Sequence, residues 1–336
     1  MLYKELRNRL YKLLYKRGYL KVMFKEGLRI VSTGHYAPPK VVTNDDLSKI
    51  VDTNDEWISS RTGIRRRHFV EEQTNLSMAL AAVSEALERA DIDKAKIGAC
   101  IVATVKPDNL TPSMACMIQA KLGLPEGIPC MDINAACSGF TYAMVTARGL
   151  LMQSGKKYGV IVGSETLSRM LDMTDRSTCV LFGDGAGAAV IELNDSNKFC
   201  YVLGSRGNDE VLVCPNMNTT DRFVHMVGSE VFKFAVGTVT KAVNELLEKA
   251  SVSADDIDYF ICHQANLRII ESVAKKVKQP LDKFYVNLDE YGNTSSASIP
   301  LVMNEMNEKG MLKAGMKIIC VGFGGGLTWG GAYLEW

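Results

Sequence analysis

An internal repeat constrains the fold of this chain more than any other feature of its sequence. Apolar residues recur at helical spacing through residues 76–90, and the same pattern returns 160 residues later, in residues 236–250. SEALERA in the first copy stands beside NELLEKA in the second. Each copy continues into a short apolar run typical of a buried strand, IGACIV (97–102) and IDYFIC (257–262). The chain is therefore predicted to contain two similar α/β halves.

The similarity continues beyond these strands with a small change of register. CMDIN, which precedes Cys137 and a helix-like run, parallels FYVNL, which precedes Asn293 and a second such run. GVIVG (159–163) likewise parallels IICVG (318–322). Two halves of this kind can pack about a pseudo-twofold axis with helices enclosing both sheets. We expect a first half at 27–200 and a second half at 201–336.

The composition argues against several classes of protein. Among the 336 residues, 39 Lys and Arg nearly balance 38 Asp and Glu, so the net charge of +1 argues against a nucleic-acid-binding surface. The nine cysteines are scattered and never spaced C-x-x-C, which argues against a disulfide framework and a metal site and favours the reducing cytoplasm. No apolar run approaches the roughly 18 residues that a membrane-spanning helix needs.

Residues 1–26 are expected to form a basic extension. Eight Lys and Arg against two Glu give residues 1–27 a charge of +6, which leaves −5 for the rest of the chain. Leucines at helical spacing beside these cations are compatible with an amphipathic helix that would contact a membrane surface or an acidic partner. The favoured interpretation is instead a poorly ordered extension, or translation that begins at Met23. Deletion of residues 1–22 separates the two interpretations, because only the first predicts a loss of activity or folding.

Three polar residues follow apolar strands where the two halves should face each other: Cys137, His263 and Asn293. In open α/β sheets, sites lie beyond the carboxyl ends of the strands. His263 corresponds to Ala103 in the first copy, so the polar side chain is present in one copy only. We therefore expect the three residues to form one site.

Cys137 is the candidate nucleophile of this site. It precedes the helix-like run SGFTYAMVTARGLLM, and the positive end of a helix lowers the pKa of a thiol. We therefore expect a thiolate at neutral pH, with small flanking residues that leave room for a substrate carbonyl. Each residue also has a structural interpretation, as a buried free thiol, a structural His, and a turn or N-cap Asn. The local sequence leaves both interpretations open.

Two glycine-rich segments bear on the chemistry. VGFGGGLTWGG is typical of a strand, a glycine turn and a second strand, and such a turn can expose N–H donors as an oxyanion hole requires. FGDGAGAAVIEL leads into an apolar strand, whereas a dinucleotide-binding fingerprint opens a helix. The chain is therefore not expected to bind a dinucleotide through this segment.

Together with the early VDTNDEWISSRTGIRRRH, the segments DINAACSGF, FGDGAGAAVIE, HQANLRII, YGNTSSASIP and GFGGGLTWGG resemble β-ketoacyl-acyl-carrier-protein synthase III. The resemblance extends from about Gly27 to Trp336. It implies a thiolase-like α/β fold whose duplicated halves form a layered α-β-α-β-α sandwich, and a homodimer. It also implies the initiating condensation of type II fatty acid synthesis. An acyl group would pass from acyl-coenzyme A to Cys137 and then condense with malonyl-acyl carrier protein, with loss of CO2 and without a cofactor.

The resemblance also implies roles for individual residues. His263 and Asn293 would donate hydrogen bonds to the enolate oxygen of the decarboxylating malonyl thioester, and the N–H groups of Cys137 and Gly325 would form the oxyanion hole. The other implied contacts are Trp57, Arg61 and Arg176 for the coenzyme A nucleotide, Asn266 for pantetheine, Lys233 and Arg268 for the carrier protein, and Thr111 and Phe323 for the acyl pocket.

The sequence departs from the acetyl-primed members of the family at Thr111, where those enzymes place a Phe that closes the acyl pocket across the dimer. The smaller side chain predicts longer or branched primers, unless neighbouring residues refill the space.

Other interpretations of the function remain: a related condensing enzyme of polyketide or other secondary metabolism, a 3-hydroxy-3-methylglutaryl-coenzyme A synthase, a papain-like thiol hydrolase, and a non-catalytic binding protein. DEWISSRTGI and HQANLR favour the synthase III interpretation.

Overall fold

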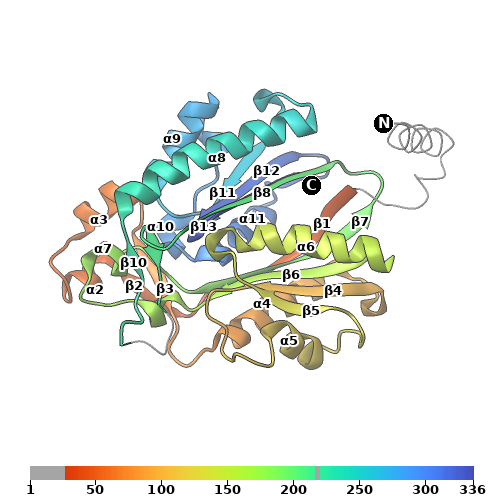
Figure 1. The fold of residues 1–336 in the computed structure, drawn as a ribbon, viewed down its shortest axis with the longest axis horizontal. Helices are drawn as coiled ribbons and strands as arrows, with labels where there is room; N and C mark the ends of the chain where they lie inside the picture. Colours follow the sequence, from red (N-terminus) through yellow and green to blue (C-terminus); the bar gives the residue numbers. More distant parts are fainter. Residues whose placement is uncertain (1–26, 216–219) are drawn as a thin grey trace, which may run out of the picture.

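The computed structural model describes residues 27–215 and 220–336 and contains two main sheets (Figure 1). The first sheet has the order β1-β7-β6-β4-β5, and the second has the order β11-β12-β13-β8. The strands of the first sheet are β1 (Gly27–Tyr36), β4 (Ile97–Ala103), β5 (Cys130–Ile133), β6 (Tyr158–Glu165) and β7 (Gly185–Asn194). The strands of the second sheet are β8 (Phe199–Asn208), β11 (Tyr259–Cys262), β12 (Lys317–Gly324) and β13 (Gly326–Glu335).

The two sheets repeat one topology, as the sequence predicted. In the first sheet, β4 pairs with β6 in parallel, β6 pairs with β7 in antiparallel, and β7 pairs with β1 in antiparallel. In the second, β11 and β12 are parallel, and β13 and then β8 add antiparallel. The helices and strands predicted at 76–90, 97–102, 236–250 and 257–262 all form, although the last strand begins at Tyr259.

The strand predicted for FYVNL is the exception, because only a single bridge from Phe284 to Phe260 takes the place of β5 in the second sheet. The side chain of Gln264 satisfies the backbone there instead. Its Nε2 donates to the carbonyl of Tyr285 at 3.2 Å, and its Oε1 accepts from the N–H of Asn287 at 3.1 Å. A side chain thus replaces the pairing that a neighbouring strand would provide.

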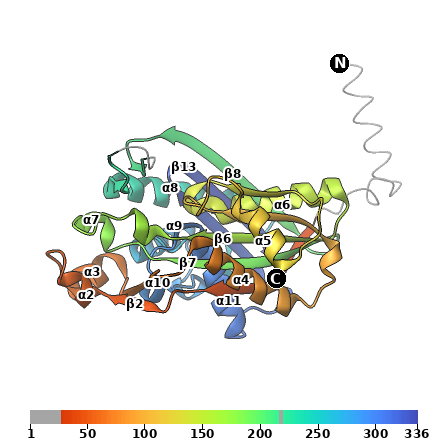
Figure 2. The same cartoon turned by 90° about the horizontal axis from the view of Figure 1, so that it is seen from below.

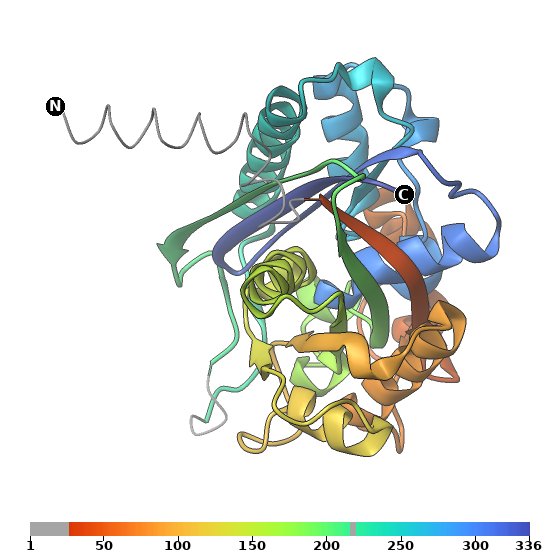
Figure 3. The same cartoon turned by 90° about the vertical axis from the view of Figure 1, so that its right-hand side faces the viewer.

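In the part of the chain that the structure describes, six helices enclose and separate the sheets. Alternating apolar faces of the strands pack on different helices, as Val160 and Val162 face one cluster and Ile161 faces another. Figures 1 and 3 show the resulting order of helix, sheet, helix, sheet and helix, which confirms the predicted sandwich. The outer helices are α4 (Asn75–Ala90) and α5 (Met114–Leu122) on the first sheet and α8 (Gly228–Ala250) and α9 (Leu267–Val277) on the second, with α6 (Gly139–Ser154) and α11 (Ser298–Glu308) between the sheets.

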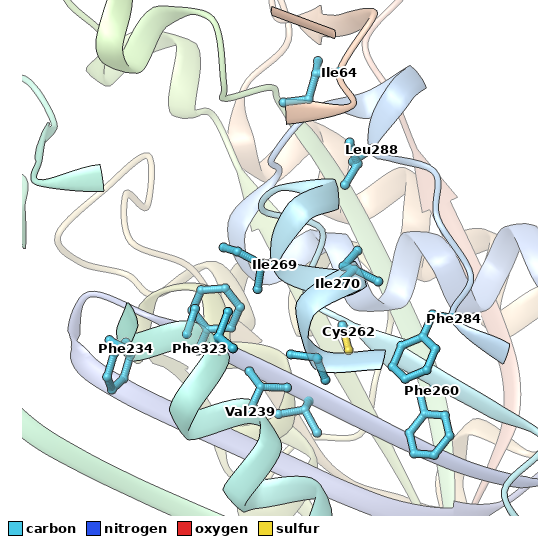
Figure 4. Packing of buried hydrophobic residues seen from close by; sticks show 14 of the residues in the cluster. Ile64, Phe234, Val239, Phe260, Cys262, Ile269, Ile270, Phe284, Leu288 and Phe323 are labelled. Atoms are coloured by element: carbon cyan, nitrogen blue, oxygen red, sulfur yellow. The ribbon is translucent and has the colours of Figure 1, made fainter. Parts of the chain in front are cut away.

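Segments of the first half complete the core of the second. Figure 4 shows Ile64 beside Leu288, with Ile269 and Ile270 of α9 beyond them, and all four belong to one buried cluster. The helices α2, α3 and α7 gather at the same end of the molecule in Figures 1 and 2. The smaller elements are β2 (Lys40–Thr43), α2 (Asn44–Ser48), α3 (Asp55–Thr62), β3 (Arg66–Phe69), α7 (Arg176–Cys179), β9 (Leu212–Val213), β10 (His225–Met226) and α10 (Leu288–Tyr291).

Short 3-10 turns lead into the two central helices. Residues Ala136–Ser138 (η2) precede α6, and residues Ser295–Ala297 (η6) precede α11. Each turn packs against a glycine of the opposite sheet, since a Cβ at Gly322 of β12 would lie 2.9 Å from the carbonyl oxygen of Cys137 and a Cβ at Gly163 of β6 would lie 2.2 Å from that of Ser296. The turn of each half therefore packs on a strand of the other half. The remaining 3-10 turns are η1 (Lys94–Lys96), η3 (Leu167–Met170), η4 (Ala254–Asp256) and η5 (Leu281–Lys283).

Within residues 27–215 and 220–336, no helix is both long and apolar enough to cross a membrane. All nine cysteines are unpaired. The basic extension predicted at 1–26 lies outside the described residues.

Replacing Gly163 with Ala should destabilise the protein strongly, because the added methyl group meets backbone atoms of η6 that cannot move aside. We expect a loss of about 1–3 kcal/mol or more in the free energy of unfolding, measured by urea denaturation. Gly149→Ala is the matched control, since its methyl group meets nothing within 4 Å on α6 and should leave stability equal or higher. Equal stability of the two variants would refute the cross-packing.

Candidate active site

Cys137 lies in the turn η2 between β5 and α6, with its side chain 8% exposed. Ala136 before it has a left-handed backbone, with φ of 44°. A Cβ at Gly324 would lie 2.7 Å from the backbone nitrogen of Cys137, so only a glycine lets β12 approach this closely. The hydroxyl of Thr328 contacts the carbonyls of Ala135 at 2.9 Å and Gly325 at 3.0 Å, which ties this turn to the glycine turn after β12.

His263 follows β11 and is 1% exposed. Its Nδ1 lies 2.7 Å from the hydroxyl of Ser298, which itself accepts from the N–H of Gln264 at 3.4 Å. When the hydroxyl of Ser298 donates to Nδ1, the ring hydrogen of His263 lies on Nε2. Burial lowers the pKa of His263 to about 3, so the imidazole is neutral at physiological pH.

Asn293 lies in the turn before η6 and is 7% exposed. Its Oδ1 accepts from the N–H of Ser295 at 2.9 Å, which leaves Nδ2 as a free donor. Its backbone is fixed by bonds to the carbonyl of Leu181 at 2.9 Å and to the N–H of Gly183 at 3.0 Å. The side chain thus presents a donor in a defined position.

Two cavities meet at Cys137. The smaller, about 260 Å³, is lined by all three predicted site residues, together with Asn266 and Phe323. The larger, about 1400 Å³, is lined by Cys137 and by Gly325, Ser295, Leu110 and Phe182 among others. The structure therefore brings Cys137, His263 and Asn293 together, and it gives the sulfur access from two sides.

The protonation state of Cys137 differs from the prediction. Burial is the largest cause that raises the pKa of its thiol, and the negative charge of Glu165 raises it as well, whereas the side chain of Ser295 lowers it. The net result is a pKa of about 12. The prediction of a thiolate in the free protein is wrong, because desolvation of the sulfur outweighs the donors around it.

The residues predicted to bind coenzyme A lie together on the surface beside α3 and α9. The guanidinium groups of Arg61 and Arg176 lie 4.7 Å and 4.8 Å from the ring centroid of Trp57. Asn266 caps α9, and its Nδ2 donates to the carbonyl of Arg61 at 3.2 Å. The carrier-protein candidates Lys233 and Arg268 are both exposed, and Lys233 pairs with Glu230 at 2.8 Å.

The two residues predicted for the acyl pocket lie apart. Phe323 lines the smaller cavity, where its ring meets that of His263 edge to face at 5.3 Å. Thr111 is exposed and lines neither cavity, whereas its neighbour Leu110 lines the larger one. The role of Thr111 across a dimer concerns a second chain and stays a prediction.

Within residues 27–215 and 220–336, one group of side chains that could hold a metal lies outside both cavities, formed by His35, Glu85 and Glu308. Arg89 donates to each of the two carboxylates at 2.6 Å, so a cation is already present among them. The expectation of a protein without a metal stays a prediction.

The sequence patterns did not reveal the polar residues behind Cys137, which are Glu165, Ser295, Ser296 and Ser298. Glu165 ends β6, and its counterpart at the end of β12 is Gly324. A polar residue in only one copy of the repeat was the signal that singled out His263 against Ala103. The same signal could have singled out Glu165 against Gly324. The turns η2 and η6 also show that the structural counterpart of Cys137 is Ser296, whereas the approximate register had set it beside Asn293.

Comparisons with known proteins agree with this geometry. The family model 3-oxoacyl-[acyl-carrier-protein] synthase III C terminal matches residues 247–336, and the model 3-oxoacyl-[acyl-carrier-protein] synthase III matches residues 131–207. The β-ketoacyl-[acyl-carrier-protein] synthase III of Clostridium acetobutylicum is 48% identical over 323 residues, covering 92% of this chain and 98% of that protein. The protein of the same name from Acholeplasma laidlawii is 50% identical over 311 residues, with the same shares covered.

Solved structures give the same result. The 3-oxoacyl-[acyl-carrier-protein] synthase III from Aquifex aeolicus superposes with a TM-score of 0.88 at 42% identity, over 92% of this chain and all of that one. The priming β-ketosynthase of the R1128 polyketide pathway superposes with a TM-score of 0.87 at 33% identity, over 93% of this chain and 97% of that one. Similarity of this extent, over both halves of the chain, shows that the chain belongs to the β-ketoacyl-[acyl-carrier-protein] synthase III family.

Proposed function

We propose that this chain catalyses the initiating condensation of fatty acid synthesis, as an acyltransferase that joins an acyl group from acyl-coenzyme A to malonyl-acyl carrier protein. The products are 3-oxoacyl-carrier protein, coenzyme A and CO2. The observation that carries the proposal is the convergence of Cys137, His263 and Asn293 on one cavity of about 260 Å³. Such a site suits two-step covalent catalysis by a cysteine.

In the first step, the sulfur of Cys137 attacks the thioester of acyl-coenzyme A, and coenzyme A leaves. The carbonyl oxygen of the thioester gains negative charge as the tetrahedral intermediate forms. The N–H groups of Cys137 and Gly325 are the donors proposed to hold it, and Gly325 and Cys137 line the same cavity. Backbone donors of this kind need no reorganisation during the reaction.

In the second step, the malonyl group loses CO2 and its carbanion attacks the acylated cysteine. The thioester oxygen of the malonyl group becomes an enolate oxygen during decarboxylation. Nε2–H of His263 and Nδ2–H of Asn293 supply two donors for that oxygen, because Ser298 and Ser295 hold the opposite atoms of the two side chains. A neutral imidazole keeps its proton and acts only as a donor.

The surface beside the smaller cavity suits the two carriers of the substrates. Trp57, flanked by Arg61 and Arg176, offers an aromatic face and two cations for the adenine and phosphates of coenzyme A. Asn266 lines the smaller cavity, where pantetheine would pass. Lys233 and Arg268 are proposed to contact the acidic carrier protein at its entrance.

A homodimer is part of the proposal. In the described part of the first sheet, β5 pairs only with β4, so its other edge is open. Met131 on β5 and Leu110 before α5 are exposed apolar side chains, at 36% and 100%. An open edge with apolar neighbours favours pairing with another chain. Thr111 would then lie at the acyl pocket of the partner. The nine unpaired thiols support a reducing compartment such as the cytoplasm.

Replacing His263 with Ala should separate the two steps. Acylation of Cys137 should persist, whereas CO2 release from malonyl-carrier protein should slow by about 10²–10³-fold, because one enolate donor is lost. Intact-mass measurement reports the first step and CO2 release the second. Cys137→Ala is the control, since it should not be acylated at all. Equal losses of both steps in His263→Ala would contradict the proposed roles.

Replacing Thr111 with Phe should narrow the range of primers. We expect the wild-type protein to accept acetyl-, isobutyryl- and octanoyl-coenzyme A, and the variant to lose octanoyl use by about 10-fold or more relative to acetyl use. Thr111→Ser is the control, because it removes only one methyl group and should keep the wild-type preference. Exclusive use of the acetyl primer by the wild-type protein would defeat the hypothesis.

A further inference from the structure

A carboxylate without a cation lies buried behind Cys137. Glu165 is 0% exposed and accepts bonds from four uncharged groups. Its Oε2 accepts from the N–H of Val105 at 3.0 Å and the hydroxyl of Thr104 at 3.3 Å. Its Oε1 accepts from the hydroxyls of Ser296 at 2.7 Å and Ser295 at 3.1 Å. Burial raises the pKa of Glu165 to about 7, so the group can change its protonation near neutral pH.

The hydrogen-bonding groups around Glu165 can satisfy both the carboxylate and the protonated acid. The hydroxyl of Ser296 lies 2.7 Å from Oε1 of Glu165 and 3.0 Å from the carbonyl oxygen of Ala103. It has one hydrogen, and a carbonyl oxygen can only accept. When Ser296 donates to Ala103, the contact with Glu165 is satisfied by a hydrogen on the carboxyl group. The pocket can therefore hold the acid as well as the carboxylate.

Ser295 connects this carboxyl group to the nucleophile. Ser295 and Cys137 line the same cavity, and the side chain of Ser295 lowers the pKa of the Cys137 thiol. The hydroxyl of Ser295 also lies 3.1 Å from Oε1 of Glu165. A thiol at Cys137 can donate to this hydroxyl while the hydroxyl donates to Glu165. Ser295 has φ of 49° and Ala136 beside Cys137 has φ of 44°, both left-handed. Both sides of the contact are thus held in conformations that non-glycine residues rarely adopt.

None of the groups that hydrogen-bond to Glu165 is a titratable side chain that could take the proton in its place. The end of β4 presents Thr104 and Val105, and η6 presents Ser295 and Ser296, all uncharged. From η2, Cys137 is the titratable group whose pKa responds to the charge of Glu165. The neutral His263 bonds to Ser298 instead.

We propose that Glu165 takes the proton of Cys137 through Ser295 during acylation and returns it after condensation. This inference rests on the proposed function. In acylation the S–H bond of Cys137 breaks, its proton passes to Ser295 as the hydroxyl proton of Ser295 passes to Glu165, and the sulfur bonds to the acyl carbon. The C–S bond of acyl-coenzyme A breaks, and the coenzyme A thiolate takes a proton from solvent.

In condensation the proton returns. The malonyl carbanion bonds to the acyl carbon, the C–S bond to Cys137 breaks, and the cysteine leaves as a thiolate. Glu165 then gives its proton back through Ser295, so the thiol and the carboxylate are both restored. In this path Ser295 passes the proton, and Glu165 acts on the reacting sulfur through Ser295. No oxidant, reductant or further reactant enters the balance.

The test is the rate of Cys137 acylation by acetyl-coenzyme A, followed by rapid quench and intact mass between about pH 5.5 and pH 9. The wild-type rate should rise through about pH 7 and level off, because the carboxylate form of Glu165 is the acceptor and exists above its pKa. Glu165→Gln keeps the size of the side chain but takes no proton. It should lose this pH dependence and be slower by about 10²-fold or more at pH 8.

Two further variants separate proton transfer from structural support. Ser296→Ala removes a bond that lowers the pKa of Glu165 but lies off the path to Cys137, so the rise in rate should move to higher pH. Glu165→Asp retains a carboxylate and should retain a pH-dependent rise at a lower rate, which keeps the test open if Glu165→Gln fails to fold.

The outcomes are distinguishable. A slower Glu165→Gln variant that keeps the wild-type pH dependence would overturn the inference and leave only a structural role for Glu165. Equal rates in the variant and the wild type would overturn it too. Absence of acylation in the wild-type protein would instead contradict the proposed function.

Discussion

The geometry of the site depends on two turns, η2 and η6, each of which packs against glycines in a strand of the opposite sheet. The turn η2 with Cys137 packs on Gly322 and Gly324 of the second sheet, and the turn η6 with Ser296 packs on Gly163 of the first. Because these contacts are between backbones, a change of one side chain cannot relieve a displacement of either turn. The duplicated fold thus holds the beginnings of both central helices against each other, where the two cavities meet.

The duplication has diverged in its chemistry while keeping its architecture. At equivalent positions, the first copy has Cys137 where the second has Ser296, and it has Glu165 where the second has Gly324. The second copy adds His263. The result is a site with a nucleophile and a buried carboxyl group on one side and two neutral donors on the other. Burial without ion pairs raises the pKa of Glu165 and lowers that of His263, which gives the two groups different tasks in one low-dielectric environment.

The sequence was sufficient to predict the architecture and the three central residues, because a repeat with helix and strand periodicity determines the layers, and strand ends determine where polar side chains meet. It was not sufficient for the state of Cys137, since the desolvation of a sulfur depends on packing from β12 that lies far away in the chain. Glu165 was missed because a charged residue at the end of an apolar strand is usually solvated. The lost strand at Phe284 depends on a side-chain contact from Gln264, which no periodicity reveals.

The most direct test is to mix the protein with acetyl-coenzyme A, measure its intact mass, and then add malonyl-acyl carrier protein. The structure predicts a mass increase of one acetyl group, absent in Cys137→Ala, which disappears as CO2 and 3-oxoacyl-carrier protein form. A protein that gains no acyl group, or a Cys137→Ala variant that gains the same one, would contradict the placement of the nucleophile where the two cavities meet.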